Sequence, residues 1–229
     1  NSRDIALSIL PANHVLEGLF CFLLSIKNGL KRVFIKGLES IAQTIADENI
    51  TFMGAVPALY EVIFEEFKNL SAEHLEKIRE NYKVFFSAGA PANINLINKY
   101  KNLGIKLVQY YGMTEAASCI SIEDKDNYRM GSSGKVLPNI ELKLSPKDQE
   151  ILIKGPMVFN GYTTNSSHLD SEGYFHTGDL GKIDNDGFLY IIGRNKNVIV
   201  LDNGQKIYPE EIEEKINSIK GVKESIIYA

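Results

Sequence analysis

The chain has 229 residues, of which 44% are hydrophobic and 24% charged, and its formal net charge is −4 at pH 7. This is ordinary usage for a globular protein, and the length allows a large core in one or two domains. A nucleic-acid partner is disfavoured, because such partners call for a basic patch or stripe.

The two cysteines, Cys21 and Cys119, have no CxxC spacing. The sequence therefore indicates neither a disulfide framework nor a zinc site, and reduced thiols are typical of a cytoplasmic protein. The longest apolar run, residues 15–26, is interrupted by Glu17 and is shorter than the ~20 residues that a membrane span needs. We expect a cytoplasmic protein without a transmembrane segment. The sequence leaves a peripheral membrane contact and the oligomeric state open.

Strand-like and helix-like runs alternate from residue 4 to residue 109. Apolar residues in the run 38–49 recur at the spacing of one helix face. Pro57 suits a first helical turn, Ser71 can cap a helix, and Gly104 can end one. We expect strands at 4–10, 32–35, 50–55, 83–87 and 105–108, and helices at 38–49, from 57, from 71 and at 91–103. This alternation predicts a parallel sheet with flanking helices and right-handed crossovers.

Two loops of this predicted sheet carry candidate ligand contacts. Parallel sheets bind ligands beyond the carboxyl ends of their strands, so residues 87–91 and residues 109–115 should share one edge. In the second loop Glu115 can hold Mg²⁺, which prefers carboxylate and phosphate oxygens. Thr114 can donate to a phosphate, and Tyr111 can stack on a base. On this stretch alone, an ordinary strand-to-loop turn with one surface glutamate is the favoured interpretation.

The period of the pattern changes after residue 128. Runs at 134–145, 150–154 and 181–192 alternate or carry β-branched residues, and the Asp-Asn-Asp-Gly sequence at 184–187 predicts a hairpin turn. These runs predict a small antiparallel, barrel-like subdomain.

The last stretch predicts a further unit. A strand-like run at 198–201 and a turn precede Pro209, which opens a helix rich in glutamate in its first turns. We expect those glutamates to cap the helix and to face solvent, since the helix dipole favours negative charge there. Ile212, Ile216 and Ile219 should form the buried stripe. The predicted organisation is therefore an α/β part at 1–128, an antiparallel β subdomain at 129–192, and a hinge with the beginning of a small α+β domain at 193–229.

Five motifs stand in the order and spacing of the adenylate-forming, or AMP-binding, superfamily, which includes acyl-CoA synthetases, luciferases and peptide-synthetase adenylation domains. They are Ser-Ala-Gly-Ala-Pro at 87–91, Gln-Tyr-Tyr-Gly-Met-Thr-Glu at 109–115, Tyr-Phe-His-Thr-Gly-Asp-Leu-Gly at 174–181, Gly-Arg-Asn-Lys at 193–196 and the stretch 204–213. The chain resembles this superfamily from about residue 9 onward. With Leu-Pro-Ala-Asn-His-Val-Leu-Glu at 10–17, it is especially similar to bacterial long-chain fatty acyl-CoA synthetases.

The resemblance implies a set of nucleotide contacts. Asp179, in a Thr-Gly-Asp turn, would accept two charge-assisted hydrogen bonds from the ribose hydroxyls. Arg194 would reach the ribose or a phosphate. The other implied contacts are Tyr110, Tyr111 and Gly112, together with Gly89, Ala90 and Pro91 as the wall against adenine. A helix-entry turn, which these last three residues would also serve, is the alternative.

The resemblance also implies catalytic side chains. Thr114 and Glu115 would act at the phosphates, with Glu115 as the Mg²⁺ ligand. His14 would gate or orient the acid beside an acyl pocket; the alternative is a helix-cap histidine bonded to the backbone. Lys196 would occupy the hinge about which a small C-terminal domain rotates; the alternative is a solvated linker cation.

The implied activity is that of an acyl-CoA synthetase for a carboxylic acid, in first place a fatty acid. It uses ATP with Mg²⁺ to form acyl-AMP and transfers the acyl group to coenzyme A. Tyr110, where many relatives carry glycine, would narrow the acid pocket. The alternatives are an adenylation domain for a carrier protein or an aryl acid, and a non-catalytic nucleotide-binding module. The chain starts at Asn1 rather than Met and lacks the family's phosphate loop and catalytic lysine, so we expect a fragment that is inactive alone.

Overall fold

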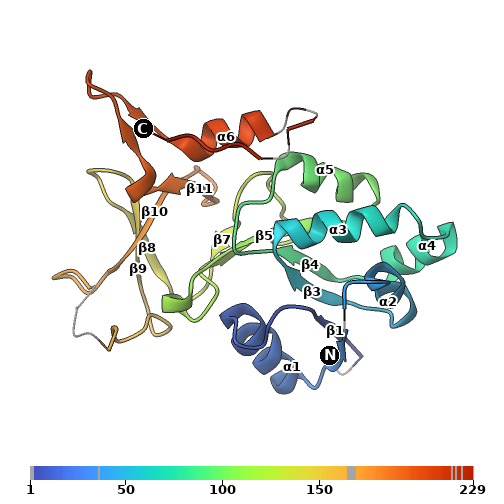
Figure 1. Ribbon diagram of the computed structural model, residues 1–229. Coiled ribbons are helices and arrows are strands. Elements are labelled where there is room, and N and C mark those ends of the chain that lie inside the picture. The colour runs from blue at the N-terminus through green and yellow to red at the C-terminus, as the bar shows by residue number, and fades with distance from the viewer. Residues whose placement is uncertain are drawn as a thin grey trace.

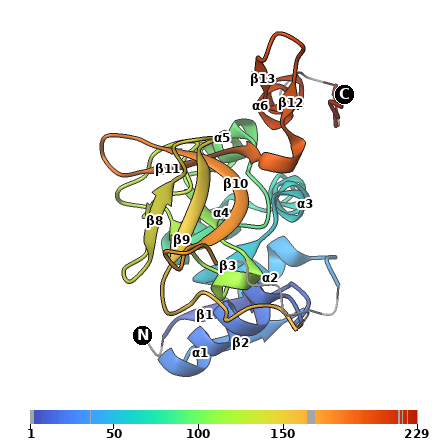
Figure 2. The same cartoon turned by 90° about the vertical axis from the view of Figure 1, so that its left-hand side faces the viewer.

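The computed structural model describes residues 3–35, 37–163, 169–217, 219, 221–222 and 224–228. It contains a seven-stranded sheet with flanking helices, a four-stranded antiparallel sheet, and a two-stranded hairpin that is followed by the last helix (Figures 1 and 2). The α/β class expected from the sequence, a parallel sheet with flanking helices followed by a smaller antiparallel sheet, is confirmed.

The seven-stranded sheet has five parallel strands and two antiparallel strands at one side. The spatial order is β2 (Lys31–Phe34), β1 (Ile5–Ser8), β3 (Phe52–Ala55), β4 (Val84–Ser87), β5 (Leu107–Tyr111), β6 (Ser121–Ile122) and β7 (Lys135–Val136). β5 runs on to Tyr111, beyond the predicted end at residue 108, since it pairs with β6. β7 also belongs to this sheet, although the sequence grouped it with the later strands.

Helices cover both faces of the large sheet. Side chains of a strand alternate between its faces, so Phe85 and Phe86 of β4 enter two different buried clusters. Phe85 packs with α2 (Ile41–Asp47), α3 (Pro57–Phe67), α4 (Ala72–Asn81) and α5 (Ile94–Asn102). Phe86 packs with a π-helical turn, η1 (Leu16–Cys21), which continues into α1 (Phe22–Asn28) (Figure 1). The four helices expected from the sequence for this part of the chain all pack on the Phe85 side, whereas η1 and α1 on the Phe86 side were not among the predicted elements.

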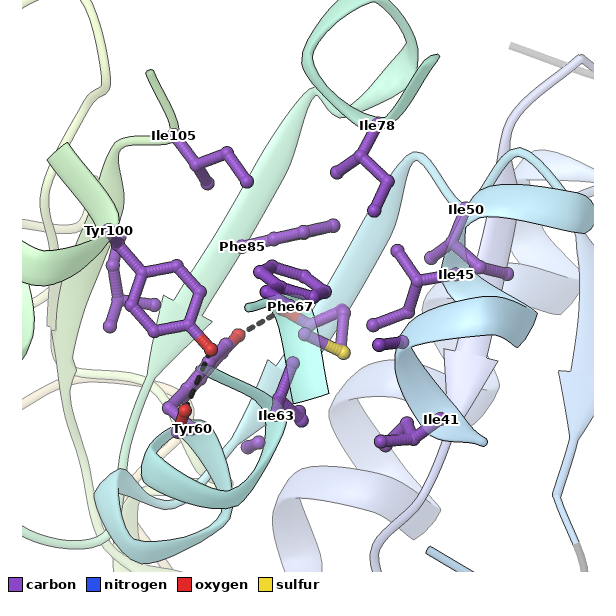
Figure 3. Close-up of a cluster of buried hydrophobic side chains, with 14 of the residues drawn as sticks. Ile41, Ile45, Ile50, Tyr60, Ile63, Phe67, Ile78, Phe85, Tyr100 and Ile105 are labelled. Carbon is purple, nitrogen blue, oxygen red and sulfur yellow. Dashed lines mark hydrogen bonds between the residues drawn. The ribbon is translucent and has the colours of Figure 1, made fainter. Parts of the chain in front are cut away.

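In the buried cluster that contains Phe85, two tyrosines form hydrogen bonds with backbone carbonyls, two of which belong to strands of the sheet (Figure 3). The Tyr60 hydroxyl lies 3.1 Å from the carbonyl oxygens of both Met53 and Phe86, and the Tyr100 hydroxyl donates to the Tyr60 carbonyl at 2.7 Å. The two rings meet edge to face with centroids 5.4 Å apart. Buried hydroxyls need such partners, because an unpaired polar group in the core is costly.

The local helix signals act as predicted. Pro57 occupies the first turn of α3, and the Ser71 side chain accepts a hydrogen bond from the backbone N–H of His74 at 3.2 Å. Gly104, with φ of +79°, follows the end of α5. These residues work through neighbours in the chain, so the sequence alone locates them.

The start of α5 differs from the prediction. The helix begins at Ile94, not at residue 91, because Asn93 is its cap and accepts from the backbone N–H of Asn95 at 2.7 Å. The N–H of Ala92 instead donates to the side chain of Gln109 at 2.9 Å. Residues 91–92 are therefore held in the loop by a contact with the next strand.

The four-stranded antiparallel sheet has the order β11 (Leu189–Arg194), β10 (Phe175–Ile183), β9 (Glu150–Lys154) and β8 (Glu141–Leu144). Residues 184–187 form the predicted turn between β10 and β11, with the Gly187 N–H donating to the Asp184 carbonyl at 3.0 Å. Tyr111 of β5 packs with Ile151 and Ile153 of β9 in a small shared core. The two sheets are thus packed together at the end of β5.

The last unit consists of η3 (Asn195–Asn197), the hairpin β12 (Ile199–Val200) and β13 (Lys206–Ile207), and α6 (Pro209–Asn217). Figure 2 shows the hairpin and α6 at one end of the molecule. The predicted buried stripe of α6 is wrong for two members, since Ile212 and Ile219 are 37% and 58% exposed. Among the described residues, none of the helices combines the length and apolar character of a membrane span.

Candidate functional site

The loops after β4 and β5 meet at one edge of the large sheet. The hydrogen bond from Ala92 to Gln109 joins them directly, so the predicted shared edge is confirmed. A second close approach lies at Gly112, where a Cβ would stand 1.4 Å from the carbonyl oxygen of Ser118. Only glycine allows the two backbone segments to pack this closely.

Two adjoining cavities open at this edge. The first, of about 550 Å³, lies between the two loops, β11 and α6. The second, of about 510 Å³, lies between the loop after β5, the segment before η1, and strands β9 and β10. Both are lined by Gly89, Tyr110, Gly112 and Arg194. The two cavities therefore adjoin at these four residues.

All but one of the predicted site residues line a cavity. The first cavity also holds Ala90, Pro91, Tyr111 and Asp179, and the second also holds His14, Thr114 and Glu115. Lys196 lines neither; it is exposed in the short helix η3. A binding contact of Lys196 has no support in the geometry, whereas a hinge role does not require one.

Asp179 is the most constrained carboxylate of the first cavity. It is 5% exposed, accepts a hydrogen bond from the Tyr111 hydroxyl at 2.8 Å, and pairs with Arg194 Nε at 3.0 Å. Burial raises the pKa of Asp179, and the contacts with Tyr111 and Arg194 oppose that rise. The residue lies inside strand β10 rather than in the predicted turn. The Tyr111 ring is itself buried, so stacking on a base stays a prediction.

Glu115 stands in the second cavity beside Thr114, which is exposed. Its carboxylate accepts from the Tyr162 hydroxyl at 2.6 Å, and its carbonyl accepts from the N–H of Phe159 at 2.8 Å. Among the described residues, no group of three or more His, Cys, Asp or Glu side chains could hold a metal ion unaided. Glu115 fits Mg²⁺ only as one protein ligand beside nucleotide oxygens and water, the arrangement that Mg²⁺ favours.

His14 fits both interpretations of its role. Its Nδ1 accepts from the N–H of Leu16 at 3.2 Å and its carbonyl accepts from the N–H of Gly18 at 2.9 Å, as a helix-entry residue would. The side chain also lines the second cavity.

Comparison with known proteins identifies the family. Residues 1–163 match the model of the AMP-binding enzymes. The chain belongs to this family. It is 33% identical over 230 residues to a 2-succinylbenzoate–CoA ligase of Listeria monocytogenes, covering 97% of this chain and 47% of that protein. It is also 31% identical over 150 residues to a long-chain-fatty-acid–CoA ligase of Mycobacterium bovis, covering 64% of this chain and 25% of that protein.

Solved AMP-binding enzymes share the fold. The o-succinylbenzoate CoA synthetase of Bacillus subtilis in complex with ATP and magnesium ion has a TM-score of 0.82 and 30% identity, over 96% of this chain and 48% of that one. ATP-bound MatB from Rhodopseudomonas palustris has a TM-score of 0.85 and 26% identity, over 99% and 47%. The resemblance to the adenylate-forming superfamily is therefore confirmed. The matches to the Listeria ligase and to these two structures cover nearly the whole of this chain but only about half the length of each relative.

Three residues that line the cavities, Ser118, Glu150 and Glu210, were not predicted as site residues. The Tyr110 hydroxyl bonds the Ser118 hydroxyl within the second cavity, and both residues are buried. Glu150 lines the same cavity. Glu210, expected to face solvent, lines the first cavity and accepts from Asn197 Nδ2 at 2.7 Å, while its Oε2 is buried without a hydrogen-bond partner among the described residues. The only sequence signal for Glu150 is a carboxylate opening an apolar strand.

Proposed function

We propose that this chain is the nucleotide-binding part of an ATP-dependent, AMP-forming acid–CoA ligase. The observation that carries the proposal is the pair of cavities that meet at Gly89, Tyr110, Gly112 and Arg194. In this proposal adenosine occupies the first cavity and the acid enters the second. The α-phosphate of the nucleotide then lies at the junction of the cavities, within reach of the acid carboxylate.

Each site residue has a defined task in the proposed reaction. Asp179 accepts hydrogen bonds from the ribose hydroxyls, and Arg194 offers positive charge at the junction of the cavities. Glu115 holds Mg²⁺, which neutralises phosphate charge when bound, and Thr114 donates to a phosphate oxygen. The acid carboxylate attacks the α-phosphorus and pyrophosphate leaves; the CoA thiol then attacks the acyl carbonyl and AMP leaves. Such transfers depend mainly on positioning and charge stabilisation.

We propose a compact acid with a polar group as the substrate. The support is the hydroxyl pair of Tyr110 and Ser118, which occupies the second cavity and offers polar groups to an acid there. The ring of Tyr110 also packs on Phe86, with centroids 5.5 Å apart, so it cannot swing aside easily. The name of the Listeria relative, a 2-succinylbenzoate–CoA ligase, agrees with this class.

A fatty acid is the second candidate. Val15, Leu16, Met113 and Phe175 give the second cavity an apolar lining, and one relative is named a long-chain-fatty-acid–CoA ligase. The two candidate acids differ in length, and the Tyr110 side chain lines the cavity that would hold them, so truncating this side chain separates them.

The test is acid-dependent pyrophosphate release by the whole protein, with and without CoA. We expect 2-succinylbenzoate to support release and palmitate to support little. Tyr110→Gly should raise the kcat/KM ratio of palmitate over 2-succinylbenzoate. Palmitate as the best acid of the unmodified protein would favour the fatty-acid candidate. If the protein binds nucleotide but releases pyrophosphate with none of the acids, the alternative of a non-catalytic nucleotide-binding module is supported. If it releases pyrophosphate but forms no thioester with CoA, a carrier protein is indicated as the acceptor.

A further inference from the structure

Strand β10 carries an irregularity where it passes β9. His176 pairs with Leu152 and Leu180 pairs with Glu150, so residues 177–179 of β10 stand opposite the single residue Ile151 of β9. Such bulges interrupt the ladder and re-aim side chains, and they are frequent next to functional sites. Here the bulge contains Asp179.

In the bulge, the N–H of Gly178 donates to a side chain of β9, that of Glu150, instead of to a backbone carbonyl of that strand. Glu150 is 8% exposed, and its Oε1 accepts from the N–H of Gly178 at 2.9 Å. Its Oε2 lies 2.9 Å from Nδ1 of His176, on the other side of the bulge. Gly178 has φ of +74°, a conformation that glycine adopts at no steric cost. The carboxylate thus spans the bulge from one end to its middle.

Thr177 completes the bulge. Its hydroxyl donates to the Ile151 carbonyl at 2.8 Å and accepts from the N–H of Asp179 at 3.1 Å. Two successive backbone N–H groups are therefore held by side chains: that of Gly178 by Glu150 and that of Asp179 by Thr177. The Asp179 carboxylate can then point into the first cavity, where it meets Tyr111 and Arg194.

We propose that Glu150 is a positioning residue that holds the 177–179 bulge so that Asp179 faces the ribose. The inference rests on the proposed ribose role of Asp179 and goes beyond it, because Glu150 itself does not touch the nucleoside in this arrangement. A buried carboxylate that accepts a backbone N–H makes a charge-assisted hydrogen bond, which is stronger than a neutral one. Its removal should free the turn and weaken ribose recognition in the first cavity, which Glu150 does not line.

The experiment measures binding by calorimetry, with AMP and 2′,3′-dideoxy-AMP as probes and the whole protein as the sample. The unmodified protein should bind AMP more tightly. Glu150→Ala should weaken AMP binding about tenfold or more, the usual cost of one charge-assisted hydrogen bond, and leave 2′,3′-dideoxy-AMP binding nearly unchanged. Glu150→Gln should keep most of the preference for AMP over 2′,3′-dideoxy-AMP, since the amide oxygen can still accept from the N–H of Gly178. Glu141→Gln, which alters an exposed carboxylate on β8 that accepts from Tyr174, is the matched control and should bind both probes as the unmodified protein does.

Hydrogen exchange gives a readout without nucleotide. The Gly178 N–H should exchange at least about tenfold faster in Glu150→Ala, because its acceptor is gone. If that variant does not fold, Glu150→Asp keeps the charge but withdraws the oxygen from Gly178, and it should show the same losses.

The outcomes separate the two proposals. A folded Glu150→Ala or Glu150→Asp protein that still prefers AMP to the same degree would overturn the positioning role. An unmodified protein that binds both probes alike would overturn the ribose role of Asp179, whatever Gly178 exchange shows.

Discussion

Glu123 offers a pH-dependent test of the sheet edge that carries the site. It follows β6, is 4% exposed, and accepts from the Gln109 N–H at 2.8 Å, the Ser132 hydroxyl at 2.9 Å and the Arg129 N–H at 3.3 Å. Burial raises the pKa of Glu123 from 4.5 to about 7, even though its three hydrogen bonds act in the opposite direction. The group therefore binds a proton more tightly in the folded chain than in the unfolded one.

The sign and size of the effect follow from linkage between protonation and folding. Below pH 4.5 the carboxyl is protonated in both states and imposes no penalty. Between 4.5 and about 7 the unfolded chain ionises first, so the free energy of unfolding falls as pH rises, and above this range the loss is complete. The pKa difference is roughly 2.5 units, and each unit corresponds to about 1.4 kcal/mol, so the full loss is about 3.5 kcal/mol.

The assay compares the 229-residue chain with its Glu123→Gln variant by urea unfolding at pH 5, 6, 7 and 8. Glutamine does not titrate, so the difference in unfolding free energy between the two proteins isolates Glu123. We expect the stability of the unmodified chain relative to the variant to fall by about 2.5 kcal/mol from pH 5 to pH 8, because a small part of the full loss is already present at pH 5. A difference that stays constant across this range, or that grows with pH, would refute the reasoning.

Three further predictions address the core, the loops and the metal ligand. Tyr60→Phe should lower the free energy of unfolding by about 1–3 kcal/mol, because two buried carbonyls lose a donor; chemical denaturation measures it, and no change would contradict the role of the hydroxyl. Gly112→Ala should abolish nucleotide binding or folding, since the new Cβ would overlap the Ser118 carbonyl; normal AMP binding by a folded variant would contradict the close approach. Glu115→Gln should raise the Mg²⁺ concentration needed for pyrophosphate release while sparing AMP binding, and an unchanged Mg²⁺ requirement would argue against a metal role.

The sequence by itself determined the features that depend on neighbours in the chain. The alternation of strands and helices follows from the spacing of apolar residues, and Pro57, Ser71 and Gly104 act within one helical turn. The shared edge of the two site loops also followed, because the carboxyl ends of parallel strands meet at one side. The remaining motif residues, such as His14, Asp179 and Arg194, came from the resemblance to the adenylate-forming superfamily, without knowledge of their contacts.

Tertiary structure alone decided the features that depend on pairing between distant segments. α5 starts late because the N–H of Ala92 is bound by a residue 17 positions away. Asp179 lies in a strand bulge rather than a turn because β9 pairs with β10 out of register, and its hydroxyl partner Tyr111 is 68 positions away. Glu210 is half-buried because α6 packs against β11. A hydrogen-bond partner that the fold supplies leaves no local pattern, since the residue that needs it looks the same in the sequence whether it faces solvent or another strand.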